Sequence, residues 1–427
     1  MKSPRLTRRA VTLGGLAVAA AALVPGLTLA QEFDPASTAD QTGALQAAID
    51  AAAPAGRLLL PPGRFRVSGL RLPSSMTIEG IPGATWLVAQ GAAIGAISSV
   101  SNLTLRDIGF VGDSGSDALL AIERSSGVTL TSCLFRDSPG MALQLSASAA
   151  IIDGCDFSGH GDAAIHAMDS TGLFITGNRI ARCGNAGIRI WRSESGADNS
   201  IVRGNVISEI DWRDGGNGQN GNGINVFRAD NVIVGDNAIS GCAFSAIRLN
   251  ATRNAQVSGN QCLASGEVAI FSEFGFSGSI IANNVVDGAA GGISMTNLDA
   301  EGHMAVCSGN IVRTIAPSSA VNPDTRPFGI FAEADAAIAG NVVDGVPGIA
   351  IGAGWGPYLR NVAISGNVVT NSRIGIGVSV AEGAGAVTIT GNQLDATEHA
   401  IAGMRWTQVA EPDLAAAADR YPQLSFR

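Results

Sequence analysis

The stretches AIHAM (164–168) and GIRIW (187–191) share one pattern: a small residue, an isoleucine, a variable residue and an apolar residue. They begin 23 residues apart, and the pattern recurs along the chain at similar intervals. Alternation of apolar and variable positions over four to six residues is the period of a β-strand, not of a helix. The isoleucines of the series, each preceded by Gly or Ala, are Ile165, Ile188, Ile224, Ile247, Ile270, Ile293, Ile330, Ile349, Ile376 and Ile401.

A second phrase, of which ITGNRI and VRGNVI are examples, alternates with the first. Its Gly-Asn pair is typical of a tight turn with a left-handed backbone. A near-constant period of this size indicates a stacked repeat, in which each asparagine amide can hydrogen-bond to the next. We therefore interpret these asparagines as structural: Asn178, Asn205, Asn237, Asn260, Asn284, Asn310, Asn341, Asn367 and Asn392.

The two phrases together predict an all-β fold, a right-handed parallel β-helix of about 13 coils. At one strand spacing per coil, this solenoid is a rod roughly 60 Å long. We assign the β-helix to residues 76–405. Residues 31–75 are expected to form an N-terminal cap, because Leu45, Ala48 and Ile49 have the spacing of an amphipathic helix. Residues 406–427 are expected to close the other end, with a short helix over 411–421.

The segments DQTGALQAAIDAA (40–52) and LLLPPGRFRV (58–67) resemble the opening cap of pectate-lyase-like β-helix proteins. The isoleucine and Gly-Asn coils resemble the body of that superfamily. With Arg8 and Arg9, the whole chain resembles a group of bacterial repeat proteins exported by the twin-arginine route. The resemblance implies polysaccharide lyases, hydrolases or epimerases, and also proteins that only bind.

The first 30 residues have the pattern of an export signal: basic residues, an apolar stretch and small residues before Gln31. The Arg8-Arg9 pair favours twin-arginine export over an ordinary secretory signal. We therefore expect a periplasmic or secreted protein without a membrane span once the signal is removed. Removal of four basic residues takes the formal net charge from −9 to −13, which argues against nucleic-acid binding.

Gly is abundant, at 55 residues, and only 15% of residues are charged, as suits many turns and short strands. No CxxC motif occurs, so zinc is not expected, and we predict no metal site. We interpret the six cysteines as small buried residues. Cys133 and Cys155 occupy similar places in consecutive repeats and are the one pair that suggests a disulfide. The oligomeric state is left open.

The residues one and three positions after each inward isoleucine point outward. These two columns carry His, Arg, Asn, Phe, Trp and Glu, a combination that suits sugar binding better than a plain solvated face. The alternative is a face covered by loops and packed for stability.

Two long insertions, 209–223 and 314–329, enter the same face and are candidate walls of a site, or tolerated surface excursions. The predicted substrate-binding residues are Trp191, Asn225, Phe227, Asn250, Phe271 and Glu333.

His166 and Arg189 hold the same slot in adjacent coils, so their backbones should lie about 4.8 Å apart. A polysaccharide lyase or C5-epimerase removes a proton beside a uronate carboxylate. That step needs a base, for which His is suited, and a cation, for which Arg is suited. Such a pair is similar to the arrangement in mannuronan C5-epimerases. The alternative for His166 is a surface histidine without a catalytic role.

Arg248 and Glu273 form a second candidate catalytic cluster, with Asn250 and Phe271 beside them. Arg248 is suited to binding a carboxylate, and Glu273 is a candidate acid, base or calcium ligand. The alternative is a surface ion pair. A glycoside hydrolase needs two carboxylates. Glu273 and Glu333 share a column two coils apart, about 10 Å, and Asp211 and Asp214 are further partners.

The leading hypothesis is therefore an exported enzyme that acts on an acidic polysaccharide by lyase or epimerase chemistry, with His166 and Arg189 central. The alternatives are a glycoside hydrolase that uses paired carboxylates and a non-catalytic glycan-binding or envelope-structural protein. Each names a polysaccharide as the partner, and none requires a cofactor, with calcium left open at Glu273.

Overall fold

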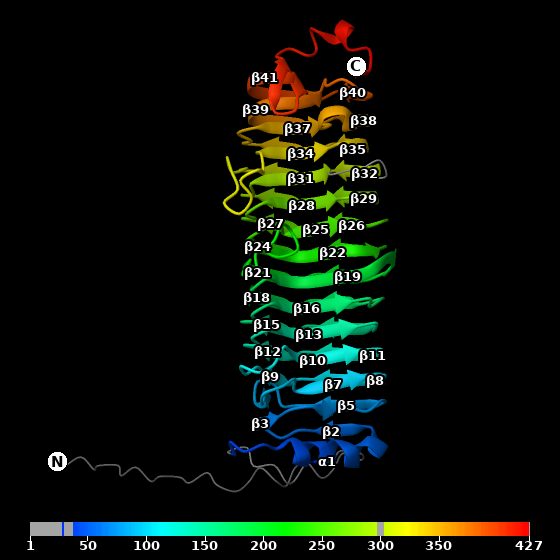
Figure 1. Ribbon diagram of the computed structural model, residues 1–427, viewed down its shortest axis with the longest axis vertical. Helices are drawn as coiled ribbons and strands as arrows, with labels where there is room; N and C mark the ends of the chain where they lie inside the picture. Colours follow the sequence, from blue (N-terminus) through cyan, green and yellow to red (C-terminus); the bar gives the residue numbers. More distant parts are fainter. Residues whose placement is uncertain (1–27, 30–36, 297–302, 427) are drawn as a thin grey trace, which may run out of the picture.

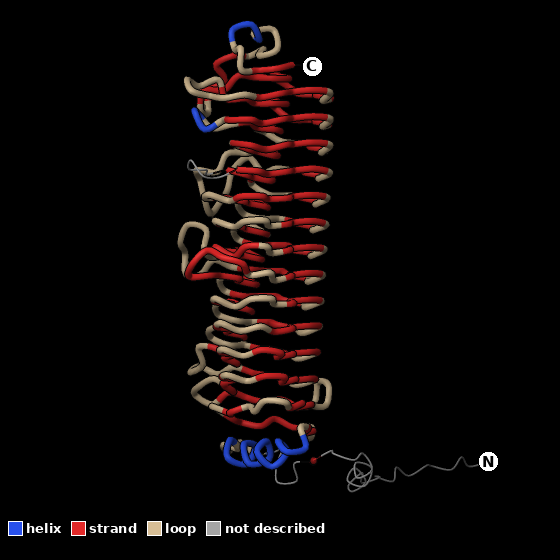
Figure 2. The backbone as a smooth tube through the Cα atoms, turned by 90° about the vertical axis from the view of Figure 1, so that its right-hand side faces the viewer, coloured by secondary structure: helices blue, strands red, loops and turns tan. Residues whose placement is uncertain are grey.

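The isoleucine phrases form strands, and the strands of successive coils pair in parallel into a long rod (Figures 1 and 2). This computed structural model describes residues 28–29, 37–296 and 303–426. The expected export signal, residues 1–30, lies outside the described residues except for Thr28 and Leu29. The β-solenoid has about 13 turns and one N-terminal helix, which confirms the predicted fold class. Among the described residues, no helix is long and apolar enough to cross a membrane.

Each coil contributes a strand to three stacks in turn, which we call the first, second and third sheets. The first sheet contains β1 (Thr28–Leu29), β2 (Arg57–Leu59), β5 (Met76–Glu79), β8 (Ser101–Arg106), β11 (Ser126–Thr131), β14 (Ala150–Asp153), β17 (Phe174–Thr176), β20 (Ile201–Arg203), β23 (Ile233–Gly235), β26 (Gln256–Ser258), β29 (Ser277–Ala282), β32 (His303–Ser308), β35 (Ala334–Ala339), β38 (Arg360–Ser365), β40 (Val387–Thr390) and β43 (Leu424–Phe426).

The second and third sheets join near the C-terminal end, where one long strand serves both. The second sheet contains β3 (Gly63–Val67), β6 (Thr85–Ala89), β9 (Gly109–Val111), β12 (Leu134–Arg136), β15 (Asp156–Ser158), β18 (Arg179–Cys183), β21 (Val206–Ile210), β24 (Ala238–Cys242), β27 (Gln261–Leu263), β30 (Val285–Asp287), β33 (Ile311–Arg313) and β36 (Val342–Asp344). The third sheet contains β4 (Leu70–Arg71), β7 (Gly95–Ser98), β10 (Ala118–Glu123), β13 (Met141–Ser146), β16 (Ala163–Met168), β19 (Ala186–Ala197), β22 (Asn222–Asp230), β25 (Ile247–Asn250), β28 (Val268–Glu273), β31 (Gly291–Thr296), β34 (Phe328–Ala332), β37 (Ile349–Ala353), β39 (Val368–Ser379) and β41 (Gln393–Arg405).

The two ends of the rod are closed differently. Helix α1 (Thr42–Ala52) covers the N-terminal end with Leu45 and Ile49 turned into the core, as the spacing predicted. Strand β2 already pairs in parallel with β5, from Arg57 on, inside the segment we assigned to the cap. At the C-terminal end β42 (Gln408–Glu411) pairs antiparallel with β41. The short helix expected over 411–421 is confirmed only in part: turns occupy residues 414–417, and a 3₁₀ helix, η3 (Ala418–Arg420), follows them.

The isoleucine column fills the interior of the rod. Ile165, Ile188 and Ile224 are register partners in the third sheet, and all are fully buried. One member of the predicted column is wrong, because the partner of Ile330 is Ile351 and not Ile349. GIAI (348–351) offers an isoleucine at two positions of the same alternation, so period alone does not choose between them.

The asparagines form the predicted ladder at the turn between the first and second sheets. Each side-chain amide donates to the side-chain oxygen of the next asparagine, from Asn178 through to Asn392, over 2.9–3.0 Å. The six cysteines are free and buried, so Cys133 and Cys155 form no disulfide in this structure. Cys155 continues the ladder through its backbone, because its N–H donates to Asn178 Oδ1 over 2.9 Å.

Removing one rung of this ladder should be costly. The Asn260 amide donates to Asn284 Oδ1 and to the Val234 carbonyl, and its oxygen accepts from the Asn237 backbone N–H and amide. We expect Asn260→Ala to lower the free energy of unfolding by about 3 kcal/mol, because it leaves buried groups unpaired. Denaturant unfolding measures this. Gln256→Ala removes an exposed amide from the extended strand β26 and should cost less than about 1 kcal/mol; equal losses would contradict the structural role.

Buried His160 makes stability depend on pH. Burial lowers its pKa to about 3, and the Arg136 guanidinium acts in the same direction. An unfolded histidine has a pKa of about 6.5, so below that pH the unfolded state binds a proton that the folded state excludes. We expect the free energy of unfolding to fall by about 1.4 kcal/mol per pH unit as the pH drops from about 6.5 toward 3. Denaturant unfolding of wild type and His160→Gln at several pH values measures the slope. His166, whose pKa is also lowered, is unchanged in both, so an equal slope would contradict the assignment.

Candidate functional site

Two long loops stand at one corner of the solenoid, where the second sheet leads into the third (Figure 1). Loop A is residues 211–221, between β21 and β22, and loop B is residues 314–327, between β33 and β34. They lie in the two predicted insertions and border the third sheet, on which the predicted site residues lie. The space between them is therefore where a site can be walled.

His166 and Arg189 are register partners on β16 and β19, as the repeat spacing predicted. The imidazole of His166 packs edge-to-face on Trp191, with the ring centroids 5.3 Å apart. Burial lowers the pKa of His166, and the Arg189 charge lowers it further, while Asp162 acts in the opposite direction. The imidazole is therefore neutral at neutral pH, the form in which histidine acts as a base.

The guanidinium of Arg189 is held by groups of this chain. It donates to Asp162 Oδ2 over 3.0 Å and to Asn220 Oδ1 of loop A over 2.8 Å, and it forms an ion pair with Asp162 Oδ1 at 3.0 Å. Its face lies over Trp191, 5.2 Å from the ring centroid. Only 5% of Arg189 is exposed. Arg189 therefore anchors loop A to the sheet, and its charge is balanced by Asp162.

A second buried cluster anchors loop B. Arg248 donates to both oxygens of Glu273 over 2.6 and 3.0 Å, and to Glu267 over 2.8 Å. The amide of Asn322, on loop B, donates to the other oxygen of Glu267 over 2.7 Å. Burial tends to lower the pKa of Arg248, but the charges of Glu273 and Glu267 outweigh it, so this pKa is raised. Arg248 therefore stays protonated and is paired with two buried carboxyl groups, those of Glu267 and Glu273.

Two adjoining cavities lie along the third sheet on either side of this cluster. The main cavity, of about 340 Å³, opens toward loop B and includes Arg248, Glu267, Phe271, Glu273, Asn322, Asp324, Arg326, Phe328, Phe331, Glu333 and Trp355 in its lining. The adjoining cavity, of about 350 Å³, lies against loop A and includes Trp191, Asn225, Phe227, Arg248, Asn250 and Glu273. Arg248 and Glu273 thus belong to both walls.

The structure divides the predicted site residues between these places. The main cavity takes Arg248, Glu273, Phe271 and Glu333. The adjoining cavity takes the predicted residues Trp191, Asn225, Phe227 and Asn250. His166 and Arg189 belong to neither lining, although Trp191 packs against both of them.

Sequence reasoning missed Glu267, Asn322, Asp324, Arg326 and Trp355, which also line the main cavity. The sequence predicts loop B as a wall, but it does not say which of its side chains turn inward. Glu267 lies before the inward isoleucine of its coil, outside the two outward columns. Its one available signal was a charged residue beside a buried strand.

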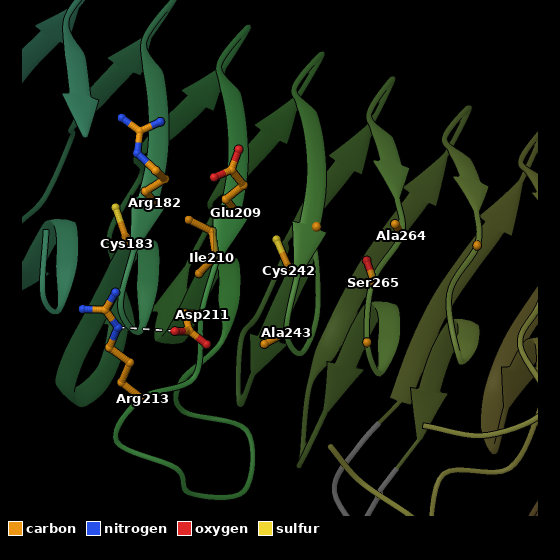
Figure 3. Close-up of a pocket in the computed structure, with 13 residues that line it drawn as sticks. Arg182, Cys183, Glu209, Ile210, Asp211, Arg213, Cys242, Ala243, Ala264 and Ser265 are labelled. Carbon is orange, nitrogen blue, oxygen red and sulfur yellow. Dashed lines mark hydrogen bonds and ion pairs between the residues drawn. The ribbon is translucent and has the colours of Figure 1, made fainter. Parts of the chain in front are cut away.

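A larger depression, of about 630 Å³, lies on the other side of loop A, over the second sheet (Figure 3). Arg182, Glu209, Asp211 and Arg213 surround a floor of glycines and alanines, and Arg213 pairs with Asp211 over 3.3 Å. None of the described residues that line it carries an aromatic ring. We therefore place the candidate site at the third sheet. Among the described residues, no group of three or more His, Cys, Asp or Glu side chains is placed to hold a metal ion.

Comparisons with known proteins agree with the fold. A family model described as a right handed beta helix region matches residues 91–218. No curated protein sequence matches the chain. The solved catalytic unit of a GH87 α-1,3-glucanase from Streptomyces thermodiastaticus is 14% identical with a TM-score of 0.61, over 91% of this chain and 70% of that chain.

Two further solved structures resemble the chain along nearly its whole length. A PL6 alginate lyase in complex with a trisaccharide is 14% identical, with a TM-score of 0.54 over 94% of this chain and 93% of that chain. The Streptococcus pneumoniae surface protein and adhesin PfbA is 12% identical, with a TM-score of 0.51 over 94% and 99%. At these identities the likeness concerns the fold. The chain is a parallel β-solenoid with a right-handed β-helix region, and it resembles pectate-lyase-like proteins.

Proposed function

We propose that the chain binds an uncharged glycan in the main cavity and hydrolyses a glycosidic bond with carboxylates of the cavity wall. The observation that carries this proposal is the chemistry of one lining: four carboxylates, two guanidiniums and several aromatic rings between loop B and the sheet. Aromatic walls with a few convergent polar groups are typical of sites for small organic ligands.

The charge balance favours an uncharged substrate over a uronate. The carboxylates Glu267, Glu273, Asp324 and Glu333 outnumber the guanidiniums of Arg248 and Arg326 by two. Arg248 is already bound to two of these carboxylates, so its charge is not available to a substrate carboxylate. An anionic sugar would enter a cavity whose lining repels it.

Glu273 and Glu333 are suited to the two roles of an inverting hydrolase. Glu273 is held by Arg248 on both of its oxygens, and in this arrangement it takes the role of the carboxylate that activates water. Glu333 lies beyond the end of β34, two strands along the sheet, at about 10 Å by strand spacing. That backbone separation is slightly above the range of about 6.5–9.5 Å between the carboxyl groups of inverting enzymes, so the two side chains must lean toward each other to act on one bond and one water.

The resemblance to a solved α-1,3-glucanase supports a glycan as the substrate, and the alginate lyase complex with a trisaccharide supports sugar binding by this fold. We also propose that the protein is exported by the twin-arginine route and meets its substrate in the periplasm or outside the cell. The basic N-terminal segment supports this location.

Product analysis tests the proposal. The purified chain is incubated with a panel of neutral and uronate-containing polysaccharides, and reducing ends, ultraviolet absorbance and the anomeric configuration of the products are followed. We expect new reducing ends from a neutral glycan, with inverted configuration and without absorbance. Retarded migration in a polysaccharide gel without any product would instead indicate a non-catalytic binding protein.

A second candidate function is lyase or C5-epimerase chemistry on an acidic polysaccharide, with His166 as the base. A neutral imidazole next to a guanidinium and an indole supports this candidate. Lyase activity would produce an unsaturated, ultraviolet-absorbing product, and His166→Ala should abolish it. A lyase or epimerase activity that survives this substitution would exclude His166 as the base.

A further inference from the structure

Trp406 occupies an unusual position at the C-terminal end of the rod. Strands β41 and β42 form an antiparallel hairpin whose two-residue turn is Trp406 and Thr407. The backbone of Trp406 has φ 56°, in the left-handed region. The side chain is 48% exposed. A large apolar ring thus stands half in solvent at the tip of a tight turn.

The left-handed backbone conformation is unfavourable for a tryptophan such as Trp406. Two-residue hairpin turns with positive φ favour Gly, Asn and Asp. A bulky side chain at positive φ is strained, and such outliers gather at functional positions. Neither the formation of the hairpin nor the packing of the core requires tryptophan at this position. The stability of the fold therefore does not explain the indole ring.

The neighbouring backbone makes room for this ring. Gly356, with φ 58°, lies under Trp406, and a Cβ atom at residue 356 would lie 2.3 Å from the indole. Trp355 packs edge-to-face on Trp406, with ring centroids 5.4 Å apart and planes at 71°. Trp355 and Gly356, from a separate segment of the chain, therefore support the exposed indole of Trp406.

Trp355 connects this ring to the candidate site, because it also lines the main cavity. Phe331 and Phe328, which line the same cavity, pack edge-to-face with centroids 5.8 Å apart. Two pairs of aromatic rings, Phe328–Phe331 and Trp355–Trp406, therefore belong to this end of the cavity, and the second pair reaches the tip of the hairpin. Trp406 is itself outside the lining, so it can meet only the part of a ligand that extends beyond the cavity.

We propose that Trp406, backed by Trp355, is an aromatic subsite on which a pyranose ring of the glycan stacks as the chain leaves the main cavity. The apolar C–H face of a sugar ring suits an indole face, and a rigid aromatic side chain binds with little loss of conformational entropy. This inference rests on the proposed function. It adds that the site prefers chains long enough to reach the hairpin.

Trp406→Asn tests the subsite, because asparagine tolerates the left-handed turn. Binding of oligosaccharides of increasing length, from a glycan the wild type binds, is measured by calorimetry. We expect about tenfold weaker binding of the longest oligosaccharides and unchanged binding of the shortest. Trp406→Phe should restore part of the affinity. Phe174→Asn removes a ring that is 45% exposed on the first sheet, and should leave binding unchanged at every length.

The outcomes separate the subsite from the proposed function. If wild type and Trp406→Asn show the same dependence of affinity on length, Trp406 is no subsite, while glycan binding in the cavity stands. If Trp406→Asn weakens short and long oligosaccharides equally, or unfolds at a clearly lower temperature, the ring has a structural role and the proposal fails. If the wild type binds no glycan of the panel, the subsite and the proposed function fail together.

Discussion

Replacing Arg248 with methionine is expected to lower the free energy of unfolding by about 3–5 kcal/mol. The guanidinium is 6% exposed and lies between Glu267 and Glu273, of which 2% and 1% are exposed. Methionine preserves much of the side-chain volume but leaves two buried carboxylates facing each other without a cation. The loss therefore comes from uncompensated charge and much less from a cavity. Equilibrium denaturation at neutral pH measures it.

An exposed ion pair supplies the matched control. Arg373 donates to Glu398 over 2.8 Å, with side-chain exposures of 44% and 51%. Arg373→Met should cost less than about 1 kcal/mol, because water screens that pair. Adding Glu267→Gln and Glu273→Gln to Arg248→Met should recover much of the stability, since both unpaired charges are then removed. If Arg248→Met costs no more than Arg373→Met, the cluster does not hold the wall together.

The cluster of Arg248, Glu267 and Glu273 also explains how a cavity with fixed walls forms on the regular surface of the solenoid. Loops have few backbone partners of their own and are usually mobile. Here the Asn322 amide is bound to Glu267, and the Ser319 hydroxyl donates to the Gly266 carbonyl over 2.6 Å. Loop A is fixed in a comparable way, by Asn220 on Arg189. Buried charges on the sheet thus fix the walls, and we expect Arg248→Met to loosen loop B before the coils themselves unfold.

The repeat made most of the fold predictable. Inward isoleucines and turn asparagines recur because every coil meets the same two requirements, an apolar interior and paired polar groups at a tight turn. Register follows from this recurrence, so His166 and Arg189 could be placed side by side from their spacing alone. Where alternation offered two equivalent isoleucines, at Ile349 and Ile351, the spacing did not decide, and the prediction was wrong.

The side-chain partners at the site were not predictable in this way. Alternation gives the direction in which a side chain leaves the strand, but not what covers it. Arg189 and Arg248 do leave the sheet on the predicted face, yet both are buried under the loops. Their partners Asn220 and Asn322 belong to insertions that occur once each, so no period positions them. The reach of such loops depends on tertiary contacts that a single sequence does not reveal.

The charge of the site was likewise hidden in the sequence. The pairing of His166 with Arg189 predicted an acidic polysaccharide as the substrate, and Arg248 offered a second cation for a substrate carboxylate. Glu267 lies before the two outward columns, so their pattern does not point to it. Its carboxylate nevertheless lies in the same wall and accepts a hydrogen bond from Arg248. With Glu267 included, the lining of the main cavity is acidic. This is the observation that moves our proposal from lyase chemistry to hydrolysis.

If the main cavity hydrolyses glycans, Glu333→Gln should lower the hydrolysis rate by about a thousandfold, because an amide cannot give a proton to the leaving oxygen. The backbone around Glu333 is held at both sides: its N–H donates to the Met295 carbonyl, and its carbonyl accepts from the Arg360 N–H, each over 3.2 Å. Glutamine has nearly the same shape, so glycan binding should persist. Initial rates and binding affinity, measured on one glycan, separate these two effects.

Glu382→Gln, a change of the same chemistry at an exposed position outside the cavity lining, is the matched control and should leave the rate unchanged. The anomeric configuration of the product tests the geometry independently. Glu273 and Glu333 lie too far apart for a covalent intermediate, which requires carboxyl groups about 5–5.5 Å apart. A retained configuration would therefore exclude this pair, as would a Glu333→Gln variant that keeps the wild-type rate. An inverted product, lost in Glu333→Gln and kept in Glu382→Gln, is the result that the two-carboxylate arrangement requires.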